Sequence, residues 1–142
     1  AKEQGFLVPK KSIFNKIIGD SHLELLFSTF LEDCADVIAY SKNYLAVHFK
    51  IDYVNADGDI SNYYPDFFVK TSEKELFIVE TKGLEDLDVP LKMFRLKQWC
   101  EDLNRVQKKI KYDFIFVDQE SFEKYAPKDF KTLIDNFTQY KN

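Results

Sequence analysis

The sequence has few of the residues that mark flexible, disulfide-bonded or metal-thiolate proteins. Its 142 residues include four glycines, four prolines and two cysteines. So little glycine and proline argues against low-complexity or long disordered tracts. The cysteines, Cys34 and Cys100, stand far apart, with no CxxC motif and no histidine cluster beside them. We therefore expect two free thiols in a reducing cytoplasm rather than a thiolate metal site.

Long apolar runs are also missing. None approaches the length of a membrane span, and no charged-then-apolar leader precedes a cleavage site. We therefore expect a cytoplasmic protein without a membrane partner. The chain starts at Ala1 without a methionine, which suggests a piece of a longer polypeptide, although processing would explain it equally well. The 45% hydrophobic and 16% aromatic content suffices for the core of one domain over residues 1–142.

The charge is acidic overall but uneven. A net charge of −4 counts against a freestanding nucleic-acid binder, which is usually basic. Residues 89–111 nevertheless carry seven cations against two acidic residues. From Arg105 onward these cations are best explained as the solvated face of a helix, whereas Lys92, Arg95 and Lys97 are better placed to meet phosphates.

Hydrophobic periodicity predicts the order of elements. Helices are expected at 12–18, from Ser21 onward, at 90–110 and at 127–140. Strands are expected at 37–40, 44–54, 63–70, 75–82 and 112–118. Strands that begin antiparallel and end with a crossover helix imply an α/β fold with a mixed central β-sheet flanked by helices.

The motif that points to chemistry is Pro65-Asp66, followed fourteen positions after the aspartate by Glu80-Thr81-Lys82. Alternate side chains of a strand share a face, so Glu80 and Lys82 point the same way and Thr81 points the other way. The strand is apolar on both faces before them, which is typical of a central, buried strand. Charged groups there are costly unless paired or metal-bound, so they are candidates for catalysis.

Plainer interpretations stay open for these residues. Glu80 and Lys82 could pair with each other at a strand end, and Asp66 could cap a turn. Glu24 falls at the margin of the apolar stripe of the helix that Ser21 begins, where it could reach the sheet edge. Equally, Ser21 and Glu24 form a capping box. Tyr63 and Tyr64 are expected to pack, with base stacking by one of them left open.

The chain resembles the C-terminal nuclease domain of type III restriction enzymes, within the PD-(D/E)XK nuclease superfamily. The resemblance runs from about Ser12 to Tyr112, which is most of the chain, and implies a restriction-endonuclease-like fold. The matching segments are Leu23-Glu24, Tyr40-Ser41-Lys42-Asn43, Phe49-Lys50-Ile51-Asp52-Tyr53, Tyr63-Tyr64-Pro65-Asp66-Phe67, Glu80-Thr81-Lys82-Gly83, Lys92 and Trp99-Cys100.

The resemblance implies a DNA endonuclease domain that uses Mg²⁺ or Mn²⁺. The metal would be held by Asp66, Glu80 and the Thr81 backbone carbonyl. Lys82 would orient the attacking water and offset charge, and Glu24 would hold a water of the metal shell or a second metal. DNA-backbone contacts are expected from Lys92, Arg95 and Gln98.

The resemblance also implies double-stranded DNA and an ATP-driven helicase or translocase as partners. The chain lacks a Gly-x-x-x-x-Gly-Lys-Ser/Thr motif, so that motor would lie elsewhere. One such site cuts one strand, so double-strand cleavage would require two domains, for example in a dimer. The alternatives are a catalytically silent module that docks DNA or protein, and a resolvase or repair exonuclease on the same fold.

Overall fold

The computed structural model describes residues 6–12, 17–18, 21–43 and 49–142. Its main sheet has four strands in the order β3-β6-β7-β8: β3 (Ala39–Lys42), β6 (Phe67–Ser72), β7 (Glu75–Lys82) and β8 (Lys111–Asp118). The pairs β3·β6 and β6·β7 are antiparallel and β7·β8 is parallel. The predicted mixed α/β sheet is therefore confirmed.

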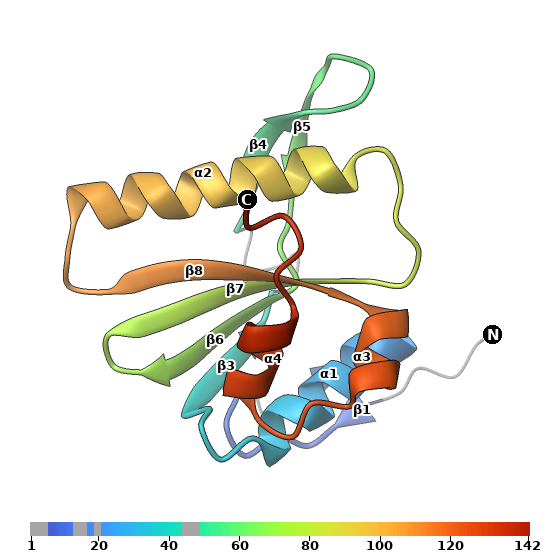
Figure 1. Ribbon diagram of the computed structural model, residues 1–142, viewed down its shortest axis with the longest axis vertical. Coiled ribbons are helices and arrows are strands. Elements are labelled where there is room, and N and C mark those ends of the chain that lie inside the picture. Colours follow the sequence, from blue (N-terminus) through green and yellow to red (C-terminus); the bar gives the residue numbers. More distant parts are fainter. Residues whose placement is uncertain (1–5, 13–16, 19–20, 44–48) are drawn as a thin grey trace.

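Helices cover both faces of this sheet (Figure 1). One face carries α2 (Val89–Val106), the crossover between β7 and β8. The other carries α1 (His22–Asp33), α3 (Gln119–Tyr125) and α4 (Phe130–Asn136). In the part of the chain that the structure describes, no helix is both long and apolar enough to cross a membrane.

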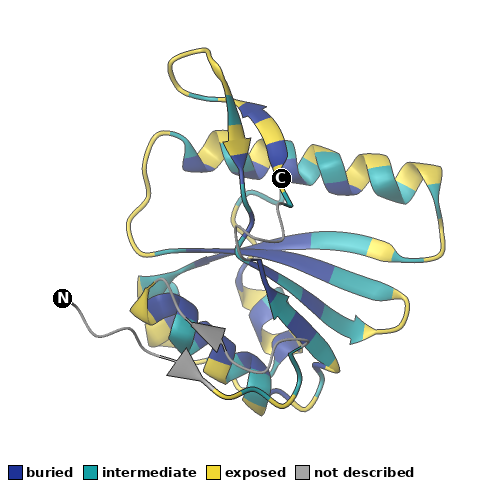
Figure 2. Ribbon diagram, turned by 180° about the vertical axis from the view of Figure 1, so that it is seen from behind, coloured by how far each residue is buried: buried dark blue, intermediate teal, exposed yellow. Residues whose placement is uncertain are grey.

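Two apolar clusters, one per face, fix these layers. On the α1 side, Phe27 packs with Phe67 and Val79; on the α2 side, Ile78 packs with Met93 and Leu96. All six side chains are buried. Successive residues of β7 thus enter opposite clusters, as strand geometry requires, and Figure 2 shows the middle of the sheet as continuously buried. The prediction that Glu75–Lys82 is a central strand is confirmed.

A separate hairpin projects beyond α2. It consists of β4 (Ile51–Val54) and β5 (Ile60–Tyr63), and its tip is exposed (Figures 1 and 2). The tip needs a left-handed backbone at Gly58, where φ is 86°, a conformation that glycine adopts without strain. The predicted strand at 44–54 is observed only from Ile51; residues 44–48 lie outside the described residues.

The predicted strand at 63–70 is split. β5 ends at Tyr63 and β6 begins at Phe67, with Pro65 in the gap, as expected from the amide hydrogen that proline lacks. The residues after this break leave the hairpin and enter the main sheet.

One helix prediction was wrong and another was too long. Ile17–Ile18 is not helical but forms β2, antiparallel to β1 (Phe6–Leu7); residues 13–16 and 19–20 are not described. The final helix predicted at 127–140 is observed only as α4, which begins after Asp129, whose side chain accepts a hydrogen bond from the Thr132 N–H. Helix α3, which was not predicted, precedes it and ends at Ala126, where φ is 42°. Short apolar runs do not separate helix from strand by periodicity alone.

Candidate active site

An open cleft of about 570 Å³ lies where β7 ends, beside the start of α1. The lining residues are Ser21, Leu23, Glu24, Asp66, Glu80, Thr81, Lys82, Gly83 and Leu84. All four residues predicted to be catalytic therefore line one cleft, although 14 positions separate Asp66 from Glu80 and more than 40 separate Glu24 from Asp66.

Asp66 is held by the backbone and side chain of β7. Its Oδ2 accepts hydrogen bonds from the Thr81 N–H and the Thr81 hydroxyl, both at 2.9 Å. The β6–β7 ladder ends at Phe67 and Val79, so Asp66 satisfies an amide that would otherwise lack a ladder partner. In a strand, the N–H and C=O of one residue face the same neighbour. The Thr81 carbonyl thus also faces the Asp66 side.

Asn43 fixes the segment that carries Asp66. Its backbone N–H donates to the Asp66 carbonyl at 2.7 Å, and its side-chain amide donates to the Pro65 carbonyl at 2.8 Å. Asn43 is 8% exposed. The segment around the proline is thereby anchored to the end of β3, which sets where the Asp66 carboxylate emerges.

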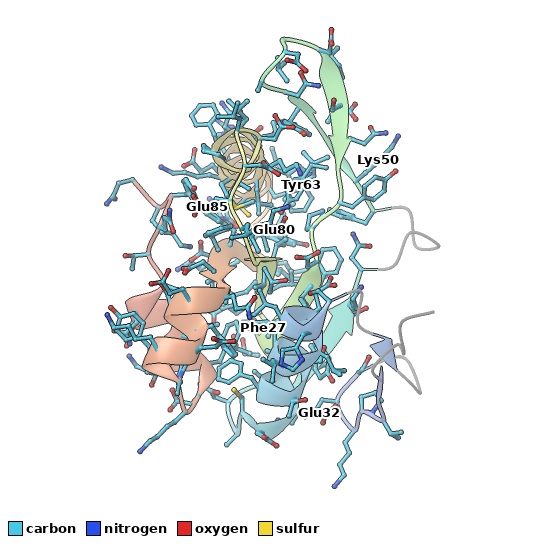
Figure 3. All side chains as sticks on the ribbon, turned by 90° about the vertical axis from the view of Figure 1, so that its right-hand side faces the viewer. Phe27, Glu32, Lys50, Tyr63, Glu80 and Glu85 are labelled. Carbon is cyan, nitrogen blue, oxygen red and sulfur yellow. The ribbon has the colours of Figure 1, made fainter. Side chains whose placement is uncertain are left out.

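Glu80 is the more deeply enclosed carboxylate, on the α2 side of β7. Its Oε1 accepts a hydrogen bond from the Tyr63 hydroxyl at 3.0 Å, and Figure 3 shows the two residues together. Burial, and then the charge of Asp66, raises the pKa of Glu80 well above its usual range; the Tyr63 hydrogen bond and the charges of Lys92 and Lys82 oppose this.

The pKa of Asp66 is raised as well. Burial is the main cause, opposed by the two Thr81 hydrogen bonds and the charge of Lys42. Burial raises the pKa of both carboxylates, and the charge of Asp66 raises that of Glu80 further, so the two groups titrate as a coupled pair. Binding of a cation between them would relieve both penalties.

Lys82 occupies the cleft rim. Its ammonium lies 3.6 Å from the Asp86 carboxylate, and its side chain is 32% exposed. Asp86 also accepts hydrogen bonds from the N–H groups of Asp88 and Val89 at the start of α2. Although partial burial acts in the opposite direction, these bonds and Lys82 lower the pKa of Asp86.

Glu24 reaches the sheet rather than only capping its helix. The Ser21 hydroxyl accepts a hydrogen bond from the Glu24 N–H at 3.2 Å, which is one half of a capping box. The Glu24 carboxylate lies 3.5 Å from the ammonium of Lys42. Ser21 thus begins the helix as predicted. Glu24 lines the cleft and pairs with Lys42 of β3.

The three predicted DNA contacts are placed differently. Lys92 lies near the cleft, because its ammonium is 5.8 Å from the ring centroid of Tyr63 and its charge acts on Glu80. Arg95 turns to the hairpin, where its Nε donates to the Asp52 carbonyl at 3.1 Å. Gln98 is exposed farther along α2. Neither Arg95 nor Gln98 lines the cleft.

Sequence reasoning missed two residues beside the site. Lys42 is 1% exposed; it shares a face of β3 with buried Tyr40, so strand alternation was a usable signal. Tyr63 was expected to pack, with base stacking open, but at 1% exposure its ring is not a surface for a base. Its bond to Glu80 joins two strands of different sheets, and no local pattern predicts such a contact.

The donors in the cleft are hard oxygen ligands. Within residues 6–12, 17–18, 21–43 and 49–142, no group of three or more His, Cys, Asp or Glu side chains is arranged to hold a metal ion. Two carboxylates and a carbonyl suit Mg²⁺ or Mn²⁺, since Mg²⁺ usually keeps several waters and takes one or two protein carboxylates. The donor set therefore fits such an ion, and the cleft lining holds none of the cysteine or histidine ligands typical of structural zinc sites.

A layered mixed sheet with acidic residues and a lysine at the end of its central strand defines a restriction-endonuclease-like domain. Comparison with protein families agrees: the family model described as "Endonuclease domain" matches residues 10–112. The chain belongs to this endonuclease-domain family. Searches of curated proteins and of solved structures gave no match.

Proposed function

We propose that the chain is a metal-dependent DNA endonuclease domain that hydrolyses phosphodiester bonds, of the kind found at the C-terminus of type III restriction enzymes. The observation that carries the proposal is the convergence of Asp66, Glu80 and Lys82 in one open cleft. Glu80 is buried and Asp66 is half-buried, and both have raised pKa values, so the empty site is destabilised and a divalent cation would reverse that effect.

Asp66, Glu80 and the Thr81 carbonyl would hold Mg²⁺ or Mn²⁺. The ion would supply Lewis acidity and neutralise the charge of the scissile phosphate. Glu80 is fixed by Tyr63 and Asp66 by Thr81, so the carboxylates are oriented before a ligand arrives. Such preorganisation is a large term in catalysis.

Lys82 orients the attacking water and stabilises the charge that develops on the phosphate. Its side chain is partly exposed in the cleft and forms a half-exposed ion pair with Asp86. Glu24, fixed by Lys42, faces the same cleft and orients water in it. Lys92 adds positive charge at the α2 side, which favours an anionic substrate such as double-stranded DNA.

Nicking of supercoiled plasmid in Mg²⁺ or Mn²⁺ tests this. We expect the chain to nick, chelation of the metal to stop it, and Lys82→Ala to lower the rate by about 10²–10⁴-fold. Lys111→Ala is the matched control, because it removes the same charge at the opposite end of the parallel β7–β8 pair. Nicking that persists in Lys82→Ala would contradict the assignment.

The proposal extends to the protein that contains this domain. The resemblance to type III enzymes implies an ATP-driven helicase or translocase in the same or an associated chain, in the cytoplasm, and two nuclease domains for a double-strand break. If the isolated chain does not nick, the same assay is made on a protein that carries this domain together with the motor. ATP-dependent, metal-dependent cleavage lost in Lys82→Ala supports the proposal; no cleavage there supports a silent docking module.

A further inference from the structure

Tyr63 stands behind the candidate active site without lining it. It is the last residue of β5, pairs with Ile51 of β4 and is 1% exposed within the apolar cluster under α2. Its hydroxyl donates to Glu80 Oε1 at 3.0 Å, and Figure 3 labels both residues. The cleft is lined by Glu80 but not by Tyr63.

This bond restricts the carboxylate. The packed ring cannot turn away, since burial on all sides fixes its rotamer. A hydroxyl held in this way restricts the orientation of the Glu80 carboxylate and occupies one lone pair of Oε1. Glu80 also lines the cleft, and because a carboxylate has about four lone-pair sites on its two oxygens, this bond leaves it able to accept a further ligand.

Tyr53 provides an internal comparison. The ammonium of Lys92 lies 5.8 Å from the ring centroids of both Tyr53 and Tyr63, within cation–π range. The Tyr53 hydroxyl, however, donates to Asp88 Oδ2 at 3.3 Å, at the start of α2. The two tyrosines therefore share a cation and a cluster, but of the two only the Tyr63 hydroxyl is bonded to Glu80.

We propose that Tyr63 is a positioning residue that orients Glu80 for binding of the divalent cation. A buried tyrosine needs some hydrogen-bond partner, and a backbone carbonyl would meet that need without touching the site. Here the partner is a carboxylate of the cleft. Hydrogen bonds to metal-ligating carboxylates commonly set metal affinity, with losses of about 10–100-fold when they are removed. The inference rests on the metal site of the proposed function.

The test measures Mn²⁺ binding directly, by the loss of the electron paramagnetic resonance signal of free Mn²⁺, in the 142-residue chain. Four proteins are compared: wild type, Tyr63→Phe, Tyr53→Phe and Glu80→Gln. We expect Tyr53→Phe to bind like wild type and Tyr63→Phe to bind about 10-fold or more weakly. Thermal denaturation is measured in parallel, because a purely structural hydroxyl would lower the melting temperature and leave Mn²⁺ affinity unchanged.

The outcomes separate the two proposals. Equal Mn²⁺ affinities in Tyr63→Phe and Tyr53→Phe overturn the role of Tyr63 while leaving the metal site intact. If wild type does not bind Mn²⁺, or if Glu80→Gln binds Mn²⁺ as tightly as wild type, the metal site itself is overturned, and this inference with it. Loss of affinity confined to Tyr63→Phe and Glu80→Gln supports both.

A second measurement covers the case in which Tyr63→Phe does not fold. The hydroxyl proton of a buried tyrosine bonded to a carboxylate exchanges slowly enough to be sought by nuclear magnetic resonance. In the Tyr53→Phe protein, saturating Mg²⁺ should shift the Tyr63 hydroxyl resonance, because the ion withdraws charge from Glu80. A resonance that does not move overturns the inference.

Discussion

The two faces of β7 treat buried charge differently. On the α1 side, Lys42 and Glu24 form a closed ion pair whose side chains are 2% and 9% exposed. On the α2 side, Glu80 is bonded to a neutral hydroxyl, and the nearby lysines, Lys82 and Lys92, are both partly exposed.

The contrast identifies the lysine that is available for chemistry. Lys42 sits where neither solvent nor substrate reaches it, so its charge serves to hold Glu24 and to favour ionised Asp66. Lys82 lies on the cleft rim, and its ion pair with Asp86 is partly exposed to solvent. On the closed α1 side, Lys42 therefore holds Glu24, which itself lines the cleft, whereas on the open α2 side Lys82 is the lysine that a substrate can reach.

The largest expected effect comes from opening the closed face. Lys42→Met removes the buried ammonium that lies 3.5 Å from the Glu24 carboxylate, and we expect the free energy of unfolding to fall by about 3–5 kcal/mol. Urea denaturation measures this. Lys70→Met on β6 is the matched control, because its pair with Glu73 is exposed and should cost at most about 1 kcal/mol.

A double variant sharpens that result. Glu24→Leu combined with Lys42→Met removes both charges, and we expect it to recover much of the lost stability, since apolar replacement of a buried pair is often neutral. If Lys42→Met lowers the free energy of unfolding by less than about 1 kcal/mol, the Lys42–Glu24 pair is not a buried ion pair of this kind.

The next effect has the opposite sign. Burial disfavours the charged form of Glu80 and raises its pKa, so the metal-free folded protein keeps a proton that the unfolded chain releases. Its stability should therefore fall as pH rises above the unfolded pKa of about 4.3. Glu80→Gln should remove this fall and stabilise the metal-free protein by about 1 kcal/mol near neutral pH.

Denaturation over a pH series in the presence of a chelator measures this effect. Added Mg²⁺ should stabilise wild type and leave Glu80→Gln unchanged, because only wild type keeps both carboxylates. Metal-free wild type that gains stability over the same rise in pH, relative to Glu80→Gln, would contradict the sign.

The hydrogen bond from the Thr81 hydroxyl to Asp66 is expected to have a smaller effect. Thr81→Val keeps the shape but removes the hydroxyl bond to Asp66, and we expect a loss of about 1 kcal/mol. Because that bond lowers the pKa of Asp66, binding of Mn²⁺ should also shift to higher pH. Thr81→Ser, which retains a hydroxyl, should restore both properties; no rescue would assign the loss to packing instead.

The sequence sufficed to predict the central sheet and the cleft residues. Glu75–Lys82 was predicted with the observed bounds, because a strand buried on both faces has a distinctive apolar run. The crossover helix followed from its 3.6-residue period, although it ends at Val106 rather than Ile110. There, Gln107 accepts from the Ile110 N–H and donates to the Leu103 carbonyl.

What could not be predicted depends on contacts between distant segments. β1 and β2 are two residues each and pair Phe6 with Ile18, which no local period encodes. The Glu32 carboxylate accepts from the Tyr40 hydroxyl and from the N–H groups of Lys10 and Lys11, which belong to other segments. Partners of a polar residue follow from topology, not from its own helix.

The smallest expected effect concerns the open face. The Lys82–Asp86 pair is 3.6 Å long, with Asp86 54% exposed, and half-exposed pairs contribute little. Asp86→Asn keeps an oxygen that accepts from the Asp88 and Val89 N–H groups, so we expect the free energy of unfolding to change by less than about 0.5 kcal/mol. Lys82 must leave Asp86 to reach an attacking water, so nicking by Asp86→Asn should be as fast as in wild type or faster. The difference in rate between the two proteins should be smallest at high salt, because salt already screens the Lys82–Asp86 pair in wild type. Slower nicking at unchanged stability would mean that Asp86 positions Lys82 rather than competing for it, and the open face would then be preorganised like the closed one.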